Sequence, residues 1–182
     1  VQETCVQNLG KLLIPSFAIG RSQEIIYILN KLKKAKRLPD VPIFVDSPLA
    51  ISATDIYRLH TECFKDDIVD MIHTEKDPFG FDNLFYVRTK EDSKRLNTTN
   101  RPCVIISASG MMEAGRIKHH LANNIENRRT TVLVVGYCAP TTLGHKIASG
   151  EKKVSIFGNI YQVNAQVREI DALSGHGDYI EM

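Results

Sequence analysis

Short apolar segments alternate with helical patterns along most of this 182-residue chain. The apolar segments are rich in Leu, Ile and Val, which is typical of strands buried on both faces. They cover residues 12–14, 43–45, 84–87, 103–107 and 131–137. The predicted helices cover residues 22–36, 49–61, 114–123 and 144–150. This order predicts an α/β fold in which helices flank a mostly parallel sheet.

The pattern changes after Glu151. Residues 154–157 and 161–170 alternate between apolar and polar side chains, and Gly158-Asn159 between them favours a two-residue turn. We therefore predict two domains. Residues 1–150 form the α/β domain, and residues 151–182 form part of a second, incomplete domain that contains a C-terminal β-hairpin. The polar stretch 65–81 gives no clear assignment.

The overall charge excludes strong electrostatic steering, because the formal net charge is only +2. A nucleic-acid partner would have to be bound at local phosphate sites. The four cysteines form no C-x-x-C pair, which disfavours a zinc knuckle and favours the reducing cytoplasm. No apolar stretch approaches the roughly 20 residues of a membrane span, so we expect no membrane partner.

Three loops share one pattern: each follows a buried strand, is rich in small residues and precedes a helix. They are 15–21, 107–116 and 136–146. Ligands of an open α/β sheet bind outside the carboxyl ends of its strands, and helix N-termini favour phosphate. Ordinary helix caps explain each loop taken singly, and that alternative stays open. The candidate phosphate-binding residues in these loops are Ser16, Arg21, Ser109, Gly110, Arg116 and Thr142.

The other polar candidates are weaker. Asp46 follows the strand 43–45 and suits either a functional role or a helix N-cap. His119 and His120 are adjacent on a predicted helix, so they point in different directions and do not easily share a metal. The chain contains no H-x-H-x-D-H or H-E-x-x-H motif. We therefore predict no metal ligands within it.

The segment Leu173-Ser174-Gly175-His176-Gly177-Asp178 follows the last alternating run. Its glycines allow a tight turn that would expose His176 to a cleft. An imidazole titrates near neutral pH, which suits proton transfer. A purely structural turn histidine is the alternative.

These loops resemble the β-CASP family of metallo-β-lactamase-fold nucleases. The similar motifs occur in one order, and the resemblance covers nearly the whole chain: LIPSFAIGRSQE (13–24), VDSPLA (45–50), SASGMMEAGR (107–116), GYCAPTTLG (136–144) and LSGHGD (173–178). The branch that looks nearest is the prokaryotic RNA-processing one, which is similar to the endonuclease subunit of the cleavage and polyadenylation factor. The DNA-repair branch is a poorer match at SASGMM.

The resemblance implies a β-CASP domain that caps a metallo-β-lactamase domain, with RNA in the cleft between them. Two zinc ions would activate a water for attack on the phosphodiester. His176 would lie near the scissile phosphate as a proton donor or charge stabiliser, and Ser174 would be a neighbouring phosphate contact.

The departures from the family pattern are as informative. The zinc motif and the acidic motif expected before Val1 are absent, and so is a histidine expected beyond Met182. We therefore expect the RNA-binding cap of a zinc-dependent ribonuclease, inactive on its own, with RNA and its own metallo-β-lactamase domain as partners. A homo-oligomer is left open.

Two other functions compete with this one. The first is a non-catalytic module that binds RNA or a protein partner within an RNA-processing complex. The second is a free-standing nucleotide-binding enzyme, which the lack of both G-x-G-x-x-G and a Walker motif disfavours.

Overall fold

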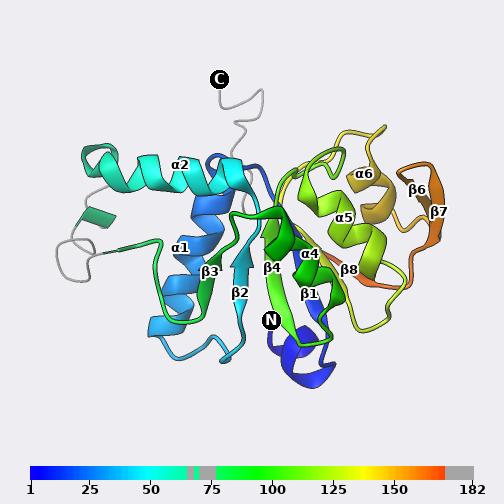
Figure 1. Ribbon diagram of the computed structural model, residues 1–182, viewed down its shortest axis with the longest axis horizontal. Coiled ribbons are helices and arrows are strands. Elements are labelled where there is room, and N and C mark those ends of the chain that lie inside the picture. The colour runs from blue at the N-terminus through cyan, green and yellow to red at the C-terminus, as the bar shows by residue number, and fades with distance from the viewer. Residues whose placement is uncertain (65–67, 70–76, 171–182) are drawn as a thin grey trace.

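A six-stranded sheet forms the centre of the molecule, with the strand order β3-β2-β4-β1-β5-β8 and every recorded pairing parallel (Figure 1). The structure is a computed structural model that describes residues 1–64, 68–69 and 77–170. The strands of this sheet are β1 (Lys11–Pro15), β2 (Ile43–Val45), β3 (Leu84–Tyr86), β4 (Cys103–Ser107), β5 (Thr131–Val134) and β8 (Gln166–Glu169). The predicted α/β class is confirmed.

Helices flank this sheet on both faces (Figure 1). They are α1 (Arg21–Lys34), α2 (Pro48–Leu59), α4 (Lys90–Thr98), α5 (Arg116–Asn124) and α6 (Leu143–Ala148), with a π-helical turn at Gln2–Gln7 and a 3-10 turn at Thr61–Cys63. No helix of the described ranges combines the length and apolar character that a membrane crossing requires.

Two hydrophobic clusters lie on opposite faces of the sheet, because side chains alternate along a strand. Leu12 and Ile14 of β1 belong to the cluster under α1 and α2, whereas Leu13 belongs to the cluster under α5 and α6. Each fully buried Leu or Ile contributes about 1.5–3 kcal/mol of apolar transfer free energy. The central strands are therefore fixed on both faces, which holds their carboxyl ends in register.

Helix α4 was absent from the sequence prediction. Thr89 caps it: its hydroxyl accepts from the Asp92 N–H at 3.1 Å and donates to the Asp92 carboxylate at 2.7 Å. Only Ser93 and Leu96 of this helix are buried, so it shows no apolar stripe. The capping pair was the available signal.

The predicted C-terminal hairpin is present but shorter. Strand β6 (Lys153–Ile156) pairs antiparallel with β7 (Asn159–Gln162). The turn lies at Phe157 and Gly158, which both have positive φ, one residue earlier than predicted. The predicted strand 161–170 is wrong in its second half, because residues 166–169 form β8 and pair in parallel with β5. The domain division near residue 151 stays a prediction.

Candidate functional site

The carboxyl ends of β1, β4 and β5 meet at one edge of the sheet, and the segments after them enclose a pocket of about 410 Å³. We call it the strand-end pocket. Residues 15–17 and 19–21 line one side together with Glu24, residues 110–111 line another, and residues 135–137 line the third. All three loops predicted to share one site therefore contribute to one pocket.

The polar side chains after β1 are already engaged. Ser16 is buried, and its hydroxyl lies 2.8 Å from that of Ser22, which donates to the Phe17 carbonyl. Arg21 forms an ion pair with Glu24 one helical turn on. A guanidinium has five N–H donors, so this pair leaves donors for a ligand. Of the two predicted phosphate contacts here, only Arg21 presents a charge to the strand-end pocket.

The loop after β4 is tightly constrained by its glycines. A Cβ built at Gly115, where φ is +76°, would lie 2.3 Å from the Ala108 carbonyl oxygen. A Cβ at Gly110 would lie 3.0 Å from the Phe17 ring. In the described part of the chain, no acceptor is recorded for the N–H groups of Gly110 and Met111. The Ser109 N–H donates to the Ala114 carbonyl at 3.3 Å, so the backbone donors that this loop offers beside the Phe17 ring are those of Gly110 and Met111.

Thr142 lies outside the lining of the strand-end pocket. Its hydroxyl accepts from the His145 N–H at 3.3 Å and donates to the Ala139 carbonyl at 2.7 Å, so it caps α6. The carboxylate of Glu113 accepts from the Leu143 N–H, which ties the loop after β4 to the same cap. Thr142 was predicted either to bind phosphate or to be an ordinary helix cap, and its hydrogen bonds are those of a cap.

Asp46 is the centre of a buried polar cluster that the sequence did not reveal. Its carboxylate is fully buried and accepts from Arg116 at 2.6 Å, His120 at 2.6 Å and Ser93 at 2.5 Å. The Ser107 hydroxyl donates to its backbone carbonyl at 2.7 Å. The N-cap of α2 is Ser47, so the alternative cap role for Asp46 is wrong.

The same cluster engages Arg116, which was predicted to bind phosphate. Besides Asp46, its guanidinium donates to the Val87 and Arg88 carbonyls at 3.0 Å each. Arg116 therefore joins β2, the segment after β3 and α5, and its role toward phosphate stays a prediction. No single local motif marks this cluster, because its members come from the end of β2, from β4, from α4 and from α5.

Two opposing effects act on the pKa of Asp46. Burial alone would raise it, but the hydrogen bonds from His120, Ser93 and Arg116 together lower it below its ordinary value. The carboxylate is thus ionised at neutral pH and attracts the Arg116 guanidinium at the start of α5.

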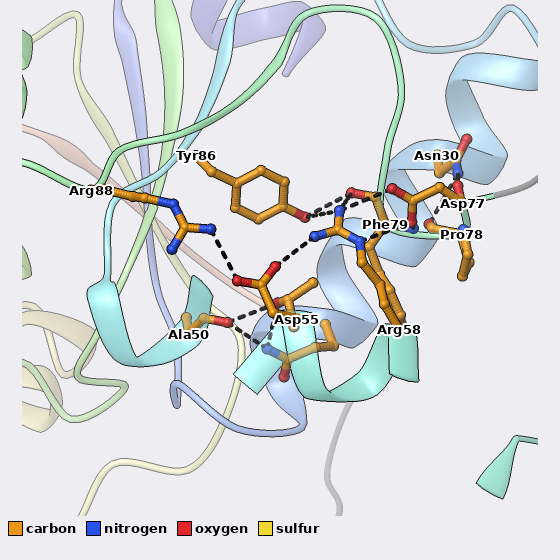
Figure 2. A network of polar contacts seen from close by, with 11 residues as sticks. Asn30, Ala50, Asp55, Arg58, Asp77, Pro78, Phe79, Tyr86 and Arg88 are labelled. Atoms are coloured by element: carbon orange, nitrogen blue, oxygen red, sulfur yellow. Dashed lines mark hydrogen bonds and ion pairs between the residues drawn. The ribbon is translucent and has the colours of Figure 1, made fainter. Parts of the chain in front are cut away.

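A second polar network fixes the outer end of α2 (Figure 2). Asp55 lies between Arg58 at 3.1 Å and Arg88 at 3.0 Å. Arg58 also holds Asp77 by two hydrogen bonds of 3.2 and 3.0 Å. Burial raises the pKa of Tyr86 to about 12, so its phenol stays protonated and donates to the Phe79 carbonyl at 2.7 Å.

A family model for the Beta-Casp domain matches residues 22–147, which is most of the chain. The chain belongs to the Beta-Casp family. The family resemblance of the sequence is thereby confirmed, and the matched region runs from the first turn of α1 to α6.

Two curated relatives of this Beta-Casp chain are ribonucleases or RNase J-like by name, and a third is a transcription termination factor. Ribonuclease TTHA0252 of Thermus thermophilus is 34% identical over 182 residues, and an RNase J-like protein of Methanocaldococcus jannaschii is 34% identical over 179 residues. The transcription termination factor FttA of Methanosarcina mazei is 30% identical over 184 residues. The matches cover 100%, 98% and 98% of this chain, but the chain spans only 42%, 40% and 29% of these relatives.

Two predicted site residues, Ser174 and His176, lie outside the described part of this Beta-Casp chain. Within the ranges that are described, no group of three or more His, Cys, Asp or Glu side chains could hold a metal ion. The described residues therefore do not fit the zinc pair implied by the resemblance.

Proposed function

We propose that this chain is the RNA-binding cap of a zinc-dependent ribonuclease that hydrolyses RNA phosphodiesters. The observation that carries the proposal is the convergence of three loops on the strand-end pocket in a Beta-Casp domain. Relatives of similar sequence that bear the name ribonuclease or RNase J-like support it.

In this proposal RNA phosphates contact the segment 109–111 and Arg21. Among the described residues no acceptor is recorded for the N–H groups of Gly110 and Met111, and Ser109 lies beside them. Helix α1 begins at Arg21 in the lining of the pocket, and the partial positive charge of its N-terminus attracts phosphate. The predicted contacts at Ser16, Arg116 and Thr142 would be secondary, because their side chains are hydrogen-bonded within the chain.

The chemical step would lie outside the described residues. Two zinc ions, bound by residues beyond those described, would supply an activated water. The predicted second domain, residues 151–182, is narrowed by β8, because residues 166–169 pair with β5 in the central sheet. We further propose that the chain after β8 leads into the returning strands of the metallo-β-lactamase domain. There His176 would transfer a proton or stabilise charge, and Ser174 would contact phosphate. Chain 1–182 alone then binds RNA without cleaving it, and the cytoplasmic location stays a prediction.

The test compares the 182-residue chain with the longer protein that contains it, using labelled single-stranded RNA and added zinc. Cleavage by the longer protein, abolished by EDTA and by His176→Ala, is expected, together with RNA binding but no turnover by the chain alone. Metal-dependent turnover by the purified chain would refute its assignment as a cap. RNA binding without cleavage by the longer protein would instead favour the non-catalytic alternative.

A second test addresses the phosphate contacts. Arg21→Ala should weaken RNA binding by about 1–3 kcal/mol, the range of a charge-assisted hydrogen bond. Arg37→Ala is the matched control, because this exposed arginine lies beyond the end of α1 and away from the strand-end pocket. Equal RNA affinity of Arg21→Ala and the unmodified protein would remove Arg21 from the site.

A further inference from the structure

Three large, exposed hydrophobic side chains line the strand-end pocket at the sheet edge. Phe17, Ile19 and Tyr137 line it and are 45%, 62% and 65% exposed. Single exposed hydrophobic side chains are common on proteins, but a gathering of them in one hollow marks a binding surface. Two of the three are aromatic and come from different loops, after β1 and after β5.

The Phe17 ring packs against the backbone of Gly110. Gly110 presents no side chain to it, and a Cβ there would approach two of its ring carbons to 3.0 and 3.1 Å. The backbone of the phosphate-binding candidate segment 109–111 therefore lies directly against the ring. A nucleotide whose phosphate binds that segment would carry its base toward the same pocket.

The charges in the pocket suit a neutral, polar-edged group. Arg21 and Glu24 both line it and form an ion pair, so a donor and an acceptor lie side by side with no net charge. A phosphate bound by Arg21 and the N–H groups of residues 110–111 would use the donors of this lining, and the Glu24 carboxylate disfavours a second phosphate beside it. A nucleobase has an uncharged π-face and an edge of mixed donors and acceptors, which matches both parts of this lining.

We infer that the strand-end pocket binds one unpaired nucleobase of the RNA, stacked on Tyr137 or Phe17 with its edge toward Arg21 and Glu24. The inference rests on the proposed RNA binding and adds the ligand class of this pocket. Its volume of about 410 Å³ lies in the range of small-molecule sites, about 300–1,000 Å³. Stacking is tolerant of base identity, so we expect little preference for one base. A base must be unpaired to stack in the pocket, so the pocket selects single-stranded over paired RNA.

The test is a binding cycle that combines protein and RNA changes. The longer protein that contains this chain is titrated with short single-stranded RNAs in which one position at a time is abasic. At one position the abasic change should weaken binding to the unmodified protein by about 5- to 150-fold, the effect of losing one base stack. Tyr137→Ala should weaken binding of the intact RNA by a similar factor. In the Tyr137→Ala protein, the abasic change at that position should then reduce the RNA affinity little further.

Two variants serve as controls. Tyr137→Phe keeps the ring and should retain the affinity for intact RNA. Phe157→Ala removes an aromatic ring that is 51% exposed, against 65% for Tyr137, from the β6–β7 turn outside the pocket, and should leave the RNA affinity unchanged.

Three results would overturn the inference or what it rests on. RNA binding unchanged by Tyr137→Ala, with every abasic position neutral, would refute the base pocket while leaving RNA binding intact. A lower melting temperature of Tyr137→Ala with unchanged RNA affinity would show that the Tyr137 ring packs against protein and not against a base. Absence of RNA binding by the unmodified protein would instead refute the proposed function itself.

Discussion

The Asp46 carboxylate joins side chains from α4 and α5 to the carboxyl end of β2. Its partners Ser93, Arg116 and His120 are separated from it by 47 to 74 residues in sequence. Through the Ser107 hydroxyl and Arg116, Asp46 holds both ends of the loop that contains Gly110. The geometry of the strand-end pocket therefore depends on a residue that does not line it.

Removal of this carboxylate should leave buried donors unpaired. We predict that Asp46→Ala lowers the free energy of unfolding by about 3–5 kcal/mol, the cost of breaking a buried ion pair from one side. Urea denaturation followed by circular dichroism measures it. Asp40→Ala is the control: the Asp40 side chain is 81% exposed beside Lys33, and its loss should cost less than about 1 kcal/mol. Equal destabilisation by both variants would contradict the role of Asp46.

The lowered pKa of Asp46 gives this contribution a pH dependence. A carboxyl whose pKa is lower in the folded state stabilises the fold fully above its unfolded pKa of about 3.9. That contribution is lost as pH falls through the folded pKa, where the carboxyl takes up a proton. Acid titration of stability should therefore show a steeper loss below about pH 4 in the unmodified chain than in Asp46→Asn. Parallel acid limbs for the two proteins would contradict this assignment.

At the scale of elements, helix α2 is fixed at its outer end by the network of Figure 2. Arg58 holds Asp77 through two donors, which a lysine cannot reproduce. We predict that Arg58→Lys costs about 1–2 kcal/mol of unfolding free energy, a range reduced for solvent screening because the arginine side chain is 29% exposed. Hydrogen exchange should also speed up at the Phe79 amide, which donates to Asp77.

The control for this prediction is Arg95→Lys. The Arg95 side chain is 80% exposed and pairs with Asp92 on the same helix, so its replacement should change stability by less than about 0.5 kcal/mol. Protection at Phe79 that is identical in Arg58→Lys and the unmodified chain would show that α2 is fixed by other contacts.

The elements that sequence alone predicted are those with strong apolar patterns. The segments that became β1, β4 and β5 are nearly all buried, and α1 and α5 carry clear apolar faces. Helix α4 was missed because it buries only two residues. Strand β8 was merged with β7, because alternation gives the period of a strand and not the identity of its neighbour.

Part of the candidate site could likewise be predicted from sequence, and part could not. The three loops could be predicted from their position after buried strands, which places them on one sheet edge. Sequence could not show that Arg116 points to Asp46, or that Thr142 caps α6 outside the pocket. Those facts depend on tertiary contacts between residues that share no local motif.

At the scale of the whole molecule, the account places RNA across the carboxyl edge of a parallel sheet. Two apolar clusters hold the strands from both faces of the sheet, and the hydrogen bonds of the Asp46 cluster hold the loop after β4. In the proposed function, the described residues would bind and orient RNA, while His176 and zinc ligands beyond the described residues would act on the scissile bond. The hairpin β6–β7 and the outer end of α2 take no part in this proposed surface.

The most direct test is photo-crosslinking of the longer protein to single-stranded RNA that carries 4-thiouridine, with the crosslinked peptides identified by mass spectrometry. The account predicts crosslinks in the segments 15–24, 108–116 and 135–138, and their loss when unlabelled RNA competes. Crosslinks confined to the β6–β7 hairpin or to the exposed end of α2, with none at the strand-end pocket, would contradict it.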